Sequence, residues 1–436
     1  MNLTMIGTGY VGLVSGAGLA DFGMNVICVD KEEQRIRKLL TGHIPFYEPG
    51  LEELVTRNVK NGRLTFTTDL RMAVKRSLVI FIAVGTPDNG RGETDLSQVK
   101  EVAGDLSQLI DDYKVVVMKS TVPVGTNRWI KEAIQKSLRK NISVDVVSNP
   151  EFLREGSAIE DFMRPNRVVL GSDNVNALAI LKDIYRSLYL IETPFVLTNL
   201  ETAELIKYAS NAFLATKISF INEVANLCEK VGADVHQVAK AMGLDKRIGP
   251  KFLHPGPGFG GSCFPKDTAA FAHLGEATGS PLRIVESVIS VNTEQRTKMI
   301  EKIETGLGSI AEKTIGVLGL SFKPNTDDVR ESPALDIVRS LLEKGAEIKA
   351  YDPAGIEEFK RIFGDQKICY CRDAYSVAKG AHALVILTEW NEFRNLDLQK
   401  ITTLLAQPVI FDLRNIYDPA KTAELGLTHI GVGRGA

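Results

Sequence analysis

The sequence predicts an α/β protein in which two doubly wound domains are joined by a long central helix. Short β-branched strands alternate with amphipathic helices through about the first 195 residues. Residues 199–231 contain neither Gly nor Pro and place apolar side chains at helical spacing, so we expect one helix of roughly 50 Å. The strand-and-helix alternation returns from about residue 312. We therefore expect domains at 1–197, 198–310 and 311–436, the middle one mainly helical.

The N-terminal domain is expected to hold a parallel sheet with helices on both faces. Continuous apolar runs bounded by turn residues are typical of strands buried on both faces. The predicted strands are "NLTMIG" (2–7), "NVICVD" (25–30), "SLVIFIAV" (77–84), "KVVVMKST" (114–121), "VDVVSNP" (144–150) and "RVVLG" (167–171).

A glycine-rich turn follows the first strand and opens a helix. Gly7, Gly9 and Gly12 have the spacing that permits a tight turn, close approach of a pyrophosphate and close helix–strand packing. Asp30 ends the second strand 18 residues after Gly12, where a carboxylate binds the adenosine ribose hydroxyls and repels a 2′-phosphate. The pattern predicts a Rossmann-like NAD site. Arg35 lies nearby, and a solvated helix arginine is its simpler interpretation.

The C-terminal domain repeats this architecture with a changed turn. Its predicted strands are "KTIGVLGLSF" (313–322), "EIKAYDP" (347–353), "ALVILTEW" (383–390) and "PVIFDLRN" (408–415), and "SPALDIVRSLLEKG" (332–345) is a helix. Because Leu320 and Ser321 replace the flexible end of the glycine turn, we expect no dinucleotide here. Lys323 and Arg330, in the loop that follows, could hold a nucleotide part of the substrate.

A second glycine-rich loop, "GFGGSCFPKD" (258–267), carries an accessible cysteine, Cys263. Glycines give access and permit unusual backbone conformations. Lys207 and Asn211 are spaced i,i+4 on one otherwise apolar or small face of the long helix, and Asp267 follows the cysteine by four residues. Thr121 ends a strand at the edge where open α/β sheets bind ligands.

These residues predict covalent oxidation chemistry at a nicotinamide site. A thiolate can attack an aldehyde to give a thiohemiacetal, and oxidation of that adduct leaves a thioester for water to cleave. The lysine and the asparagine would stabilise oxyanions. A carboxylate such as Asp267 would orient or deprotonate the water.

At this point the chain resembles the nucleotide-sugar 6-dehydrogenases of the UDP-glucose/GDP-mannose dehydrogenase family over nearly its full length, most closely those acting on UDP-glucose. The resemblance is carried by "MIGTGYVGLVSG", "STVPVGT", "NPEFLREGSAIEDFMRPNRVVLG", "ELIKYASNAFLATKISFINE", "GFGGSCFPKD" and "SFKPNTDDVRESPA". It implies an NAD domain, a central helix that forms a homodimer, and a C-terminal UDP-binding domain. It also implies UDP-glucose as substrate, oxidised twice with two NAD per sugar acid, and a role in uronic acid supply for polysaccharide.

The resemblance also implies roles for individual residues. Cys263 is the nucleophile, and Arg247 reaches the substrate of a neighbouring subunit. The catalytic set is Cys263, Lys207, Asn211, Asp267, Thr121 and Glu151. Cofactor contacts are expected from Gly7, Gly9, Tyr10, Val11, Gly12, Asp30, Arg35, Thr86, Thr121, Glu155, Lys266 and Arg330. Substrate contacts are expected from Glu151, Phe152, Leu153, Arg154, Glu155, Lys207, Asn211, Arg247, Phe252, Leu253, His254, Pro255, Gly256, Gly260 and Lys323.

Composition excludes several other classes. The net charge of −2 does not favour a nucleic-acid partner, and six scattered histidines offer no metal-ligand spacing. No apolar run reaches membrane-spanning length, and no basic leader precedes the glycine turn. The five cysteines do not suggest a disulfide framework, which favours a reducing cytoplasm.

Three alternatives remain open. Another nucleotide sugar, such as GDP-mannose or a UDP-N-acetylhexosamine, would use the same residues. A single-step hydroxyacid dehydrogenase would share the glycine turn but would have no use for Cys263. A non-catalytic NAD-binding regulator predicts a damaged catalytic set, and this set is intact.

Overall fold

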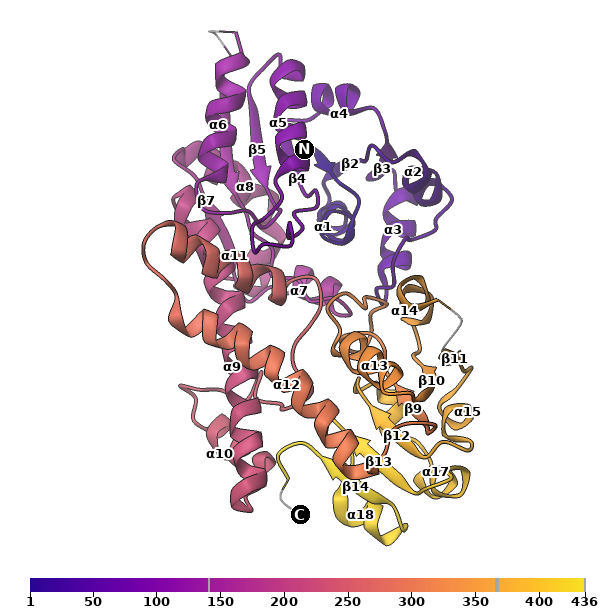
Figure 1. Ribbon diagram of the computed structural model, residues 1–436. Helices are drawn as coiled ribbons and strands as arrows, with labels where there is room; N and C mark the ends of the chain where they lie inside the picture. Colours follow the sequence, from indigo (N-terminus) through magenta and orange to yellow (C-terminus); the bar gives the residue numbers. More distant parts are fainter. Residues whose placement is uncertain (140–141, 365–367, 435–436) are drawn as a thin grey trace. The chain divides into compact units, whose positions relative to one another are not determined.

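The computed structural model describes residues 1–139, 142–364 and 368–434 (Figure 1). The chain divides into two compact units, Met1–Ser210 and Asn211–Ala436, and the boundary falls inside the helix α9 (Leu200–Val231). Each unit contains one sheet with helices on both faces. The predicted fold class is therefore confirmed, and the predicted central helix agrees with α9 to within one residue.

The first unit contains an eight-stranded sheet in the order β3-β2-β1-β4-β5-β6-β7-β8. The strands are β1 (Asn2–Ile6), β2 (Asn25–Val29), β3 (Leu64–Thr67), β4 (Val79–Ile82), β5 (Lys114–Met118), β6 (Val144–Ser148), β7 (Val168–Gly171) and β8 (Phe195–Thr198). All six predicted strands are present, and β3 and β8 are additional. The expectation of a wholly parallel sheet was wrong, because β7 pairs antiparallel with β6. A strand that is buried on both faces has the same apolar pattern whether it pairs parallel or antiparallel.

Helices cover both faces of this sheet, and each face forms its own apolar core. Leu13 of α1 and Leu54 of α3 belong to one core, and Val102 of α5 and Ile130 of α6 belong to the other. The helices are α1 (Tyr10–Asp21), α2 (Glu33–Leu40), α3 (Leu51–Lys60), α4 (Leu70–Arg76), α5 (Ser97–Leu109), α6 (Thr126–Ser137), α7 (Ala158–Met163) and α8 (Val175–Ile184), with the 3-10 helix η1 (Arg186–Ile191).

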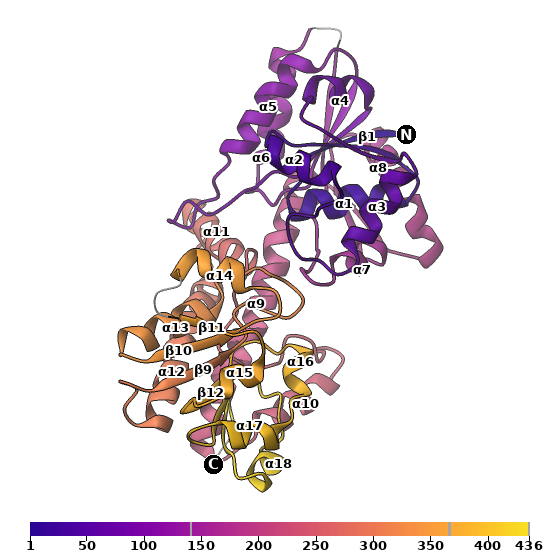
Figure 2. The same cartoon turned by 90° about the vertical axis from the view of Figure 1, so that its right-hand side faces the viewer.

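The second unit joins helices to a six-stranded parallel sheet in the order β11-β10-β9-β12-β13-β14. Figure 2 labels four of these strands, β11, β10, β9 and β12. The strands are β9 (Thr314–Leu318), β10 (Glu347–Tyr351), β11 (Ile368–Tyr370), β12 (Ala383–Ile386), β13 (Val409–Asp412) and β14 (Thr428–Gly431). Helices α9, α12, α13 and α14 pack on one face, and α15, α16 and α17 on the other. The four predicted strands are present, whereas β11 and β14 were not predicted.

Beyond α9, the helices of this unit are α10 (Val235–Leu244), α11 (Phe264–Ala277), α12 (Arg283–Leu307), α13 (Pro333–Glu343), α14 (Ile356–Phe363), α15 (Ala374–Ala378), α16 (Asn391–Arg394), α17 (Leu398–Leu404) and α18 (Pro419–Glu424). In the parts of the chain that the structure describes, no helix is both long and apolar enough to cross a membrane.

Candidate active site

The turn between β1 and α1 leaves space at one of its three glycines. A Cβ on Gly7, whose φ is +97°, would lie 2.5 Å from the Ala83 carbonyl oxygen, and one on Gly12 would lie 2.0 Å from the Gly7 carbonyl oxygen. A Cβ on Gly9, the N-cap of α1, would meet nothing within 4 Å. Two glycines are thus required by packing, while Gly9 presents bare backbone at a helix N-terminus, which fits a pyrophosphate.

Asp30 follows β2 and faces this turn. Its Oδ2 accepts hydrogen bonds from the Thr8 backbone N–H at 2.9 Å and the Thr8 hydroxyl at 2.8 Å. Burial acts to raise the pKa of Asp30, but hydrogen bonds from Glu32 and Thr8 and the charge of Arg35 outweigh it and lower the pKa. Arg35 Nη1 lies 3.0 Å from Asp30 Oδ2, so the interpretation of Arg35 as a solvated helix arginine was wrong.

Two predicted threonines meet at the carboxyl edge of the sheet. Thr86 follows β4, Thr121 follows β5, and the Thr86 hydroxyl donates to the Thr121 carbonyl oxygen at 2.9 Å. Glu155 lies in the segment between β6 and α7. Because β4, β5 and β6 are parallel neighbours, this edge of the first unit carries the predicted nicotinamide residues.

A buried ion pair joins α9 to the segment after β6. Lys207 Nζ lies 3.0 Å from Glu151 Oε1, and both side chains are about 95% buried. Burial acts to raise the pKa of Glu151, but the Lys207 charge and hydrogen bonds from Lys207 and the Leu153 N–H lower it overall. The Lys207 ammonium and the Arg167 guanidinium both lie over the Phe152 ring, at 5.3 Å and 3.4 Å from its centroid. Glu151 is therefore an ionised carboxylate in an enclosed, strongly cationic environment.

Glu48 is a site residue that the sequence analysis missed. Its buried carboxylate accepts hydrogen bonds from the Tyr10 hydroxyl and from the Gly156 and Ala158 backbone N–H groups. It therefore ties the start of α1 to the start of α7. A single acid in the "YEPG" loop carries no local signal for this role.

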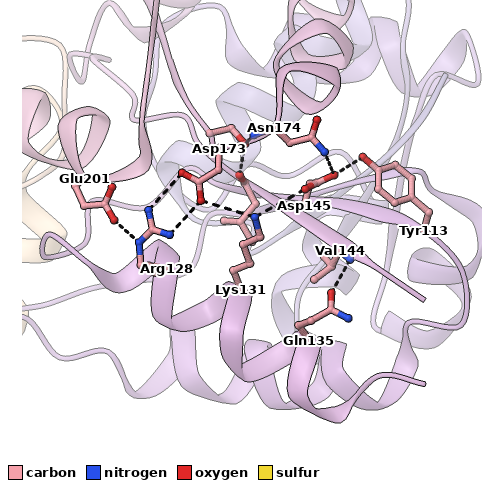
Figure 3. Close-up of polar contacts among 11 residues, drawn as sticks. Tyr113, Arg128, Lys131, Gln135, Val144, Asp145, Asp173, Asn174 and Glu201 are labelled. Carbon is pink, nitrogen blue, oxygen red and sulfur yellow. Dashed lines mark hydrogen bonds and ion pairs between the residues drawn. The ribbon is translucent and has the colours of Figure 1, made fainter. Parts of the chain in front are cut away.

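The first turn of α9 is held to the first unit by a charged cluster (Figure 3). Arg128 of α6 lies 2.5 Å from Glu201 of α9 and 3.1 Å from Asp173, which follows β7. Lys131, one turn further along α6, reaches Asp145 at 4.0 Å and Asp173 at 3.8 Å. Ion pairs thus connect α6 and the residues after β7 to the N-terminal end of α9, which precedes Lys207 in the chain.

Glu204, which the sequence analysis also missed, is a buried residue of α9 that binds the N-terminus of α6. Its carboxylate is 3% exposed and accepts from the Gly125 N–H at 2.7 Å and the Asn127 N–H at 2.8 Å, at the N-terminus of α6. Since Glu204 is three residues before Lys207, and Gly125 is four after Thr121, it couples two segments that carry predicted catalytic residues. An acid within an apolar helix stripe was the available signal.

Cys263 lies at the N-cap of α11 and is partly exposed. Its Sγ is 3.7 Å from the Ser262 hydroxyl. The positive end of the helix dipole favours negative charge at this position. Asp267 is one turn into α11, and its N–H donates to the Cys263 carbonyl oxygen at 2.8 Å. The predicted accessible cysteine therefore stands at a helix start, with Asp267 on the same face.

The Asp267 carboxylate is the meeting point of two other predicted residues. It is 1% exposed, accepts from Asn211 Nδ2 at 2.6 Å and forms an ion pair with Lys266 Nζ at 2.6 Å. The second unit thus contains Cys263, Asp267, Asn211 and Lys266 in one connected group. Lys207, one helical turn from Asn211, belongs by its contacts to the Glu151 group of the first unit.

Three buried amide side chains, here called the amide clamp, hold the glycine loop. Asn222 Oδ1 accepts from the Gly256 N–H at 2.8 Å, and Gln295 Nε2 donates to the Gly256 carbonyl oxygen at 2.9 Å. Asn292 accepts from the Phe259 N–H at 2.8 Å and donates to its carbonyl oxygen at 3.1 Å. The sequence analysis missed all three residues, although polar side chains within the apolar faces of α9 and α12 were a usable signal.

The loop also packs on the segment after β9. The Gly261 N–H donates to the Arg330 carbonyl oxygen at 2.9 Å, and a Cβ on Gly260 would lie 2.1 Å from the Glu331 carbonyl oxygen. Gly260 therefore serves close packing, and its predicted role at the sugar stays a prediction. Two predicted motifs, "GFGGSCFPKD" and "SFKPNTDDVRES", are in contact.

The structure also shows where other predicted residues lie, and their roles stay predictions. Arg247 is 89% exposed in its side chain and pairs with Asp245. Arg330 pairs with Asp328 at 2.7 Å, and the Lys323 ammonium lies 5.2 Å from the Phe322 ring centroid. The remaining predicted substrate residues of this loop are Phe252, Leu253, His254 and Pro255, and Arg154 of the first unit pairs with Asp161.

In the turn after β9, backbone N–H groups donate to a carboxylate of the chain itself, Asp352. Asp352, which follows β10 as Asp30 follows β2, is 1% exposed, and its Oδ2 accepts from the Leu320 and Ser321 N–H groups at 2.7 Å and 3.0 Å. Its Oδ1 accepts from the N–H groups of Ala354 and Gly355. The carboxylate is thus engaged by the chain at both oxygens, and the expected absence of a dinucleotide at this turn stays a prediction.

The fold and the residue groups define a class of protein. A glycine turn with an acid after β2, threonines at the carboxyl edge, and a cysteine at a helix start near a buried Asp that binds Asn and Lys define an NAD-dependent oxidoreductase. Among the described residues, no group of three or more His, Cys, Asp or Glu could hold a metal ion.

The chain belongs to the UDP-glucose/GDP-mannose dehydrogenase family. The family's NAD binding domain matches residues 1–189, its central domain 201–294 and its UDP binding domain 316–419. The chain is 50% identical to the UDP-glucose 6-dehydrogenase TuaD of Bacillus subtilis (100% of this chain, 93% of the relative). It is also 50% identical to the UDP-glucose 6-dehydrogenase of Rhizobium meliloti (100% of both chains). A solved UDP-glucose dehydrogenase from Pyrobaculum islandicum is 38% identical, with a TM-score of 0.91 over 100% of this chain and 98% of that one.

Asp30→Ala should weaken NAD binding and reduce discrimination against NADP. The ribose hydroxyls lose an acceptor and a 2′-phosphate is no longer repelled, so we expect a loss of a few kcal/mol, on the order of 100-fold in affinity. The measurement is titration of each cofactor by calorimetry. Asp352→Asn, at the matching position of the second sheet, should leave both affinities unchanged. Equal affinities for parent and Asp30→Ala would show that Asp30 does not contact the ribose.

Proposed function

We propose that the protein oxidises UDP-glucose to UDP-glucuronate in two NAD-dependent steps through a covalent adduct on Cys263. The observation that carries this proposal is the group at the start of α11. The partly exposed Cys263 stands at a helix N-terminus, one turn from a buried Asp267 that binds Asn211. Two relatives that are half identical over the whole chain are named UDP-glucose 6-dehydrogenases.

In the first oxidation the C6 hydroxyl of the sugar loses a proton and a hydride and becomes an aldehyde. NAD, when bound, accepts the hydride of each oxidation. Lys207 and Asn211 stabilise the developing alkoxide, because both are donors held on one helix face. Glu151, ion-paired to Lys207 at 3.0 Å, is the candidate acceptor for the proton.

In the second oxidation the Cys263 sulfur bonds to C6 and the thiol proton passes to the aldehyde oxygen. The resulting thiohemiacetal loses a hydride from C6 and its hydroxyl proton to become a thioester. Water then adds to the thioester carbon, the C–S bond breaks, and the acid and the thiol are released. Asp267 orients or deprotonates this water, and Thr121 and Glu155 lie on the segments proposed to face nicotinamide and water.

Individual segments are proposed to bind parts of the substrate. Residues 151–155 and 252–256 would hold the uridine and sugar parts, Gly260 the sugar, and Lys323 a phosphate. We also propose a cytoplasmic location, which five cysteines without a disulfide bond support.

The test is NADH release with a panel of UDP- and GDP-sugars. We expect UDP-glucose to be the preferred substrate and to yield two NADH per sugar consumed. One NADH per sugar would contradict the two-step proposal. Preference for GDP-mannose or a UDP-N-acetylhexosamine would contradict the sugar assignment and leave the covalent chemistry standing.

We further propose a homodimer formed through α9. Leu205, Phe213, Phe220, Leu227 and Val231 of α9 are exposed by 41%, 66%, 48%, 58% and 65%. The seven-residue spacing from 213 to 227 keeps one face of a helix in contact with a second helix. A helix face of this size on a water-facing surface is typical of an interaction site, and a second copy supplies the matching stripe. In such a dimer the exposed Arg247 would reach the substrate of the second copy.

The double variant Phe213→Asp, Phe220→Asp should be monomeric at micromolar concentration, because two charges would be buried in the interface. Light scattering measures the mass directly. Val175→Asp, which changes another exposed apolar residue (78%) on α8, should stay dimeric. A parent protein that is monomeric under the same conditions would contradict the proposal.

A further inference from the structure

A second buried lysine lies close to the Glu151–Lys207 pair. Lys119 directly follows β5, and its side chain is 5% exposed. Its Nζ donates to Asn149 Oδ1 at 3.2 Å, and that oxygen also accepts from the Tyr185 hydroxyl at 2.7 Å. Asn149 Nδ2 donates to the Val169 carbonyl oxygen at 2.9 Å. The ammonium is therefore held by a rigid, uncharged acceptor two residues before Glu151.

Lys119 differs in its surroundings from the other buried lysine of the same strand. Lys114, at the start of β5, pairs with Asp112 at 2.6 Å. Within the described parts of the chain, no carboxylate lies within 4.0 Å of Lys119 Nζ. Burial lowers the pKa of Lys119 to about 8, Glu151 acts to raise it and Lys207 to lower it. A buried ammonium without its own carboxylate is costly to folding, which is typical of a functional position.

Three cations from different elements act electrostatically on the Glu151 carboxylate, and Asp161 of α7 lines the cavity beside it. Lys207 comes from α9, Lys119 from the end of β5, and Arg167 from the segment before β7. Lys119, Glu151 and Arg167 line one cavity of about 50 Å³, which is large enough to hold water between them. The carboxylate thus has one cation in direct contact, Lys207, besides the hydrogen bond from the Leu153 N–H, and further positive charge nearby.

We propose that Lys119 is a positioning residue that serves as the reserve counter-ion of Glu151. This inference rests on the proposed function, in which Lys207 must also donate to an oxyanion of the substrate. When Lys207 turns to that oxygen, Glu151 loses its partner at 3.0 Å and would otherwise be an uncompensated buried carboxylate that takes up a proton. Lys119 keeps Glu151 ionised and able to accept the proton of the sugar hydroxyl.

The test compares Lys119→Met, which removes the charge but keeps the length, with Lys119→Arg, which keeps the charge. Lys114→Met is the matched control on the same strand. For Lys119→Met we expect turnover to fall at least tenfold, with the affinity for NAD unchanged. The acid limb of the pH–turnover profile should move to higher pH, because removing a nearby cation raises the pKa of Glu151. Lys119→Arg should keep the position of that limb and part of the turnover, and Lys114→Met should match the parent in both.

Thermal unfolding gives a second measurement that does not depend on turnover. The pKa of Lys119 is depressed in the folded protein, so its ammonium destabilises the fold at pH values below about 8, and this penalty disappears toward 10.5. Lys119→Met should therefore have a Tm at or above that of the parent at pH 7, with an advantage that shrinks as the pH rises through this window. Lys114→Met, which breaks an ion pair, should have a lower Tm.

The outcomes separate this inference from the proposed function. An active parent whose Lys119→Met variant turns over within twofold, or keeps its acid limb, overturns the role of Lys119. A Lys119→Arg variant no more active than Lys119→Met overturns it as well. If Lys119→Met does not fold, Lys119→Gln takes its place, and failure of both to fold overturns the inference in favour of a structural role. A parent that releases no NADH from any nucleotide sugar overturns the proposed function instead.

Discussion

Replacing Cys263 by serine or alanine should reduce steady turnover by on the order of 1,000-fold or more, while NAD and UDP-glucose still bind. Serine keeps the shape of the side chain but supplies a much poorer nucleophile at neutral pH. Thioester formation should nearly cease, and any ester formed on the serine should hydrolyse slowly. Intact-protein mass spectrometry after incubation with NAD and UDP-glucose would detect that adduct, and stopped-flow absorbance would follow NADH.

The matched control is Cys369→Ser, which changes an exposed free cysteine of β11 and should behave as the parent. Calorimetric titration of UDP-glucose separates loss of chemistry from loss of binding. Parental turnover with two NADH per sugar in both Cys263 variants would disprove the covalent mechanism.

Lys207→Ala should lower turnover by about 100- to 1,000-fold, which is the usual loss for one donor to an oxyanion. The same change removes the direct partner of the buried Glu151, so the pKa of that carboxylate should rise and the acid limb of the pH profile should move to higher pH. NAD affinity should change little, because the glycine turn and Asp30 are untouched. Steady-state kinetics across pH and a fluorescence titration of NADH measure the two effects.

Lys230→Met is the control for Lys207, since it changes an exposed lysine in the last turn of the same helix. It should leave turnover, pH profile and cofactor affinity unchanged. A loss below tenfold for Lys207→Ala would remove Lys207 from the chemistry and leave it as a structural counter-ion.

Much of the fold could be predicted because buried strands carry a strong local pattern. The run that became β4 is apolar along its whole length, the run that became β5 is apolar after Lys114, and α9 has no Gly or Pro. The strand β8 was missed because its burial is partial, and the direction of β7 was wrong because pairing direction depends on a connection rather than on composition.

The candidate site divides in the same way. Cys263, Asp267, Lys207 and Asn211 were found because reactive residue types stand in unusual local settings. Partners such as Glu48 could not be found, because it caps segments 108 and 110 residues away and its own loop looks ordinary. The pairing of Lys207 with Glu151, 56 residues apart, likewise depends on the tertiary fold, which brings α9 to the segment after β6.

The amide clamp has a consequence for the fate of the aldehyde between the two oxidations. With glycines alone the loop would sample many conformations, and the aldehyde would have time to leave the site before the sulfur reached its carbon. The clamp residues Asn222, Asn292 and Gln295 fix the loop backbone when the protein folds. The loop therefore does not have to become ordered when the sulfur attacks the aldehyde. In the proposed mechanism, the clamp would raise the effective molarity of the thiol at the sugar carbon. If the proposed two-step mechanism holds, the half-oxidised sugar would thereby be committed to the second step, and a reactive aldehyde would be kept out of solution.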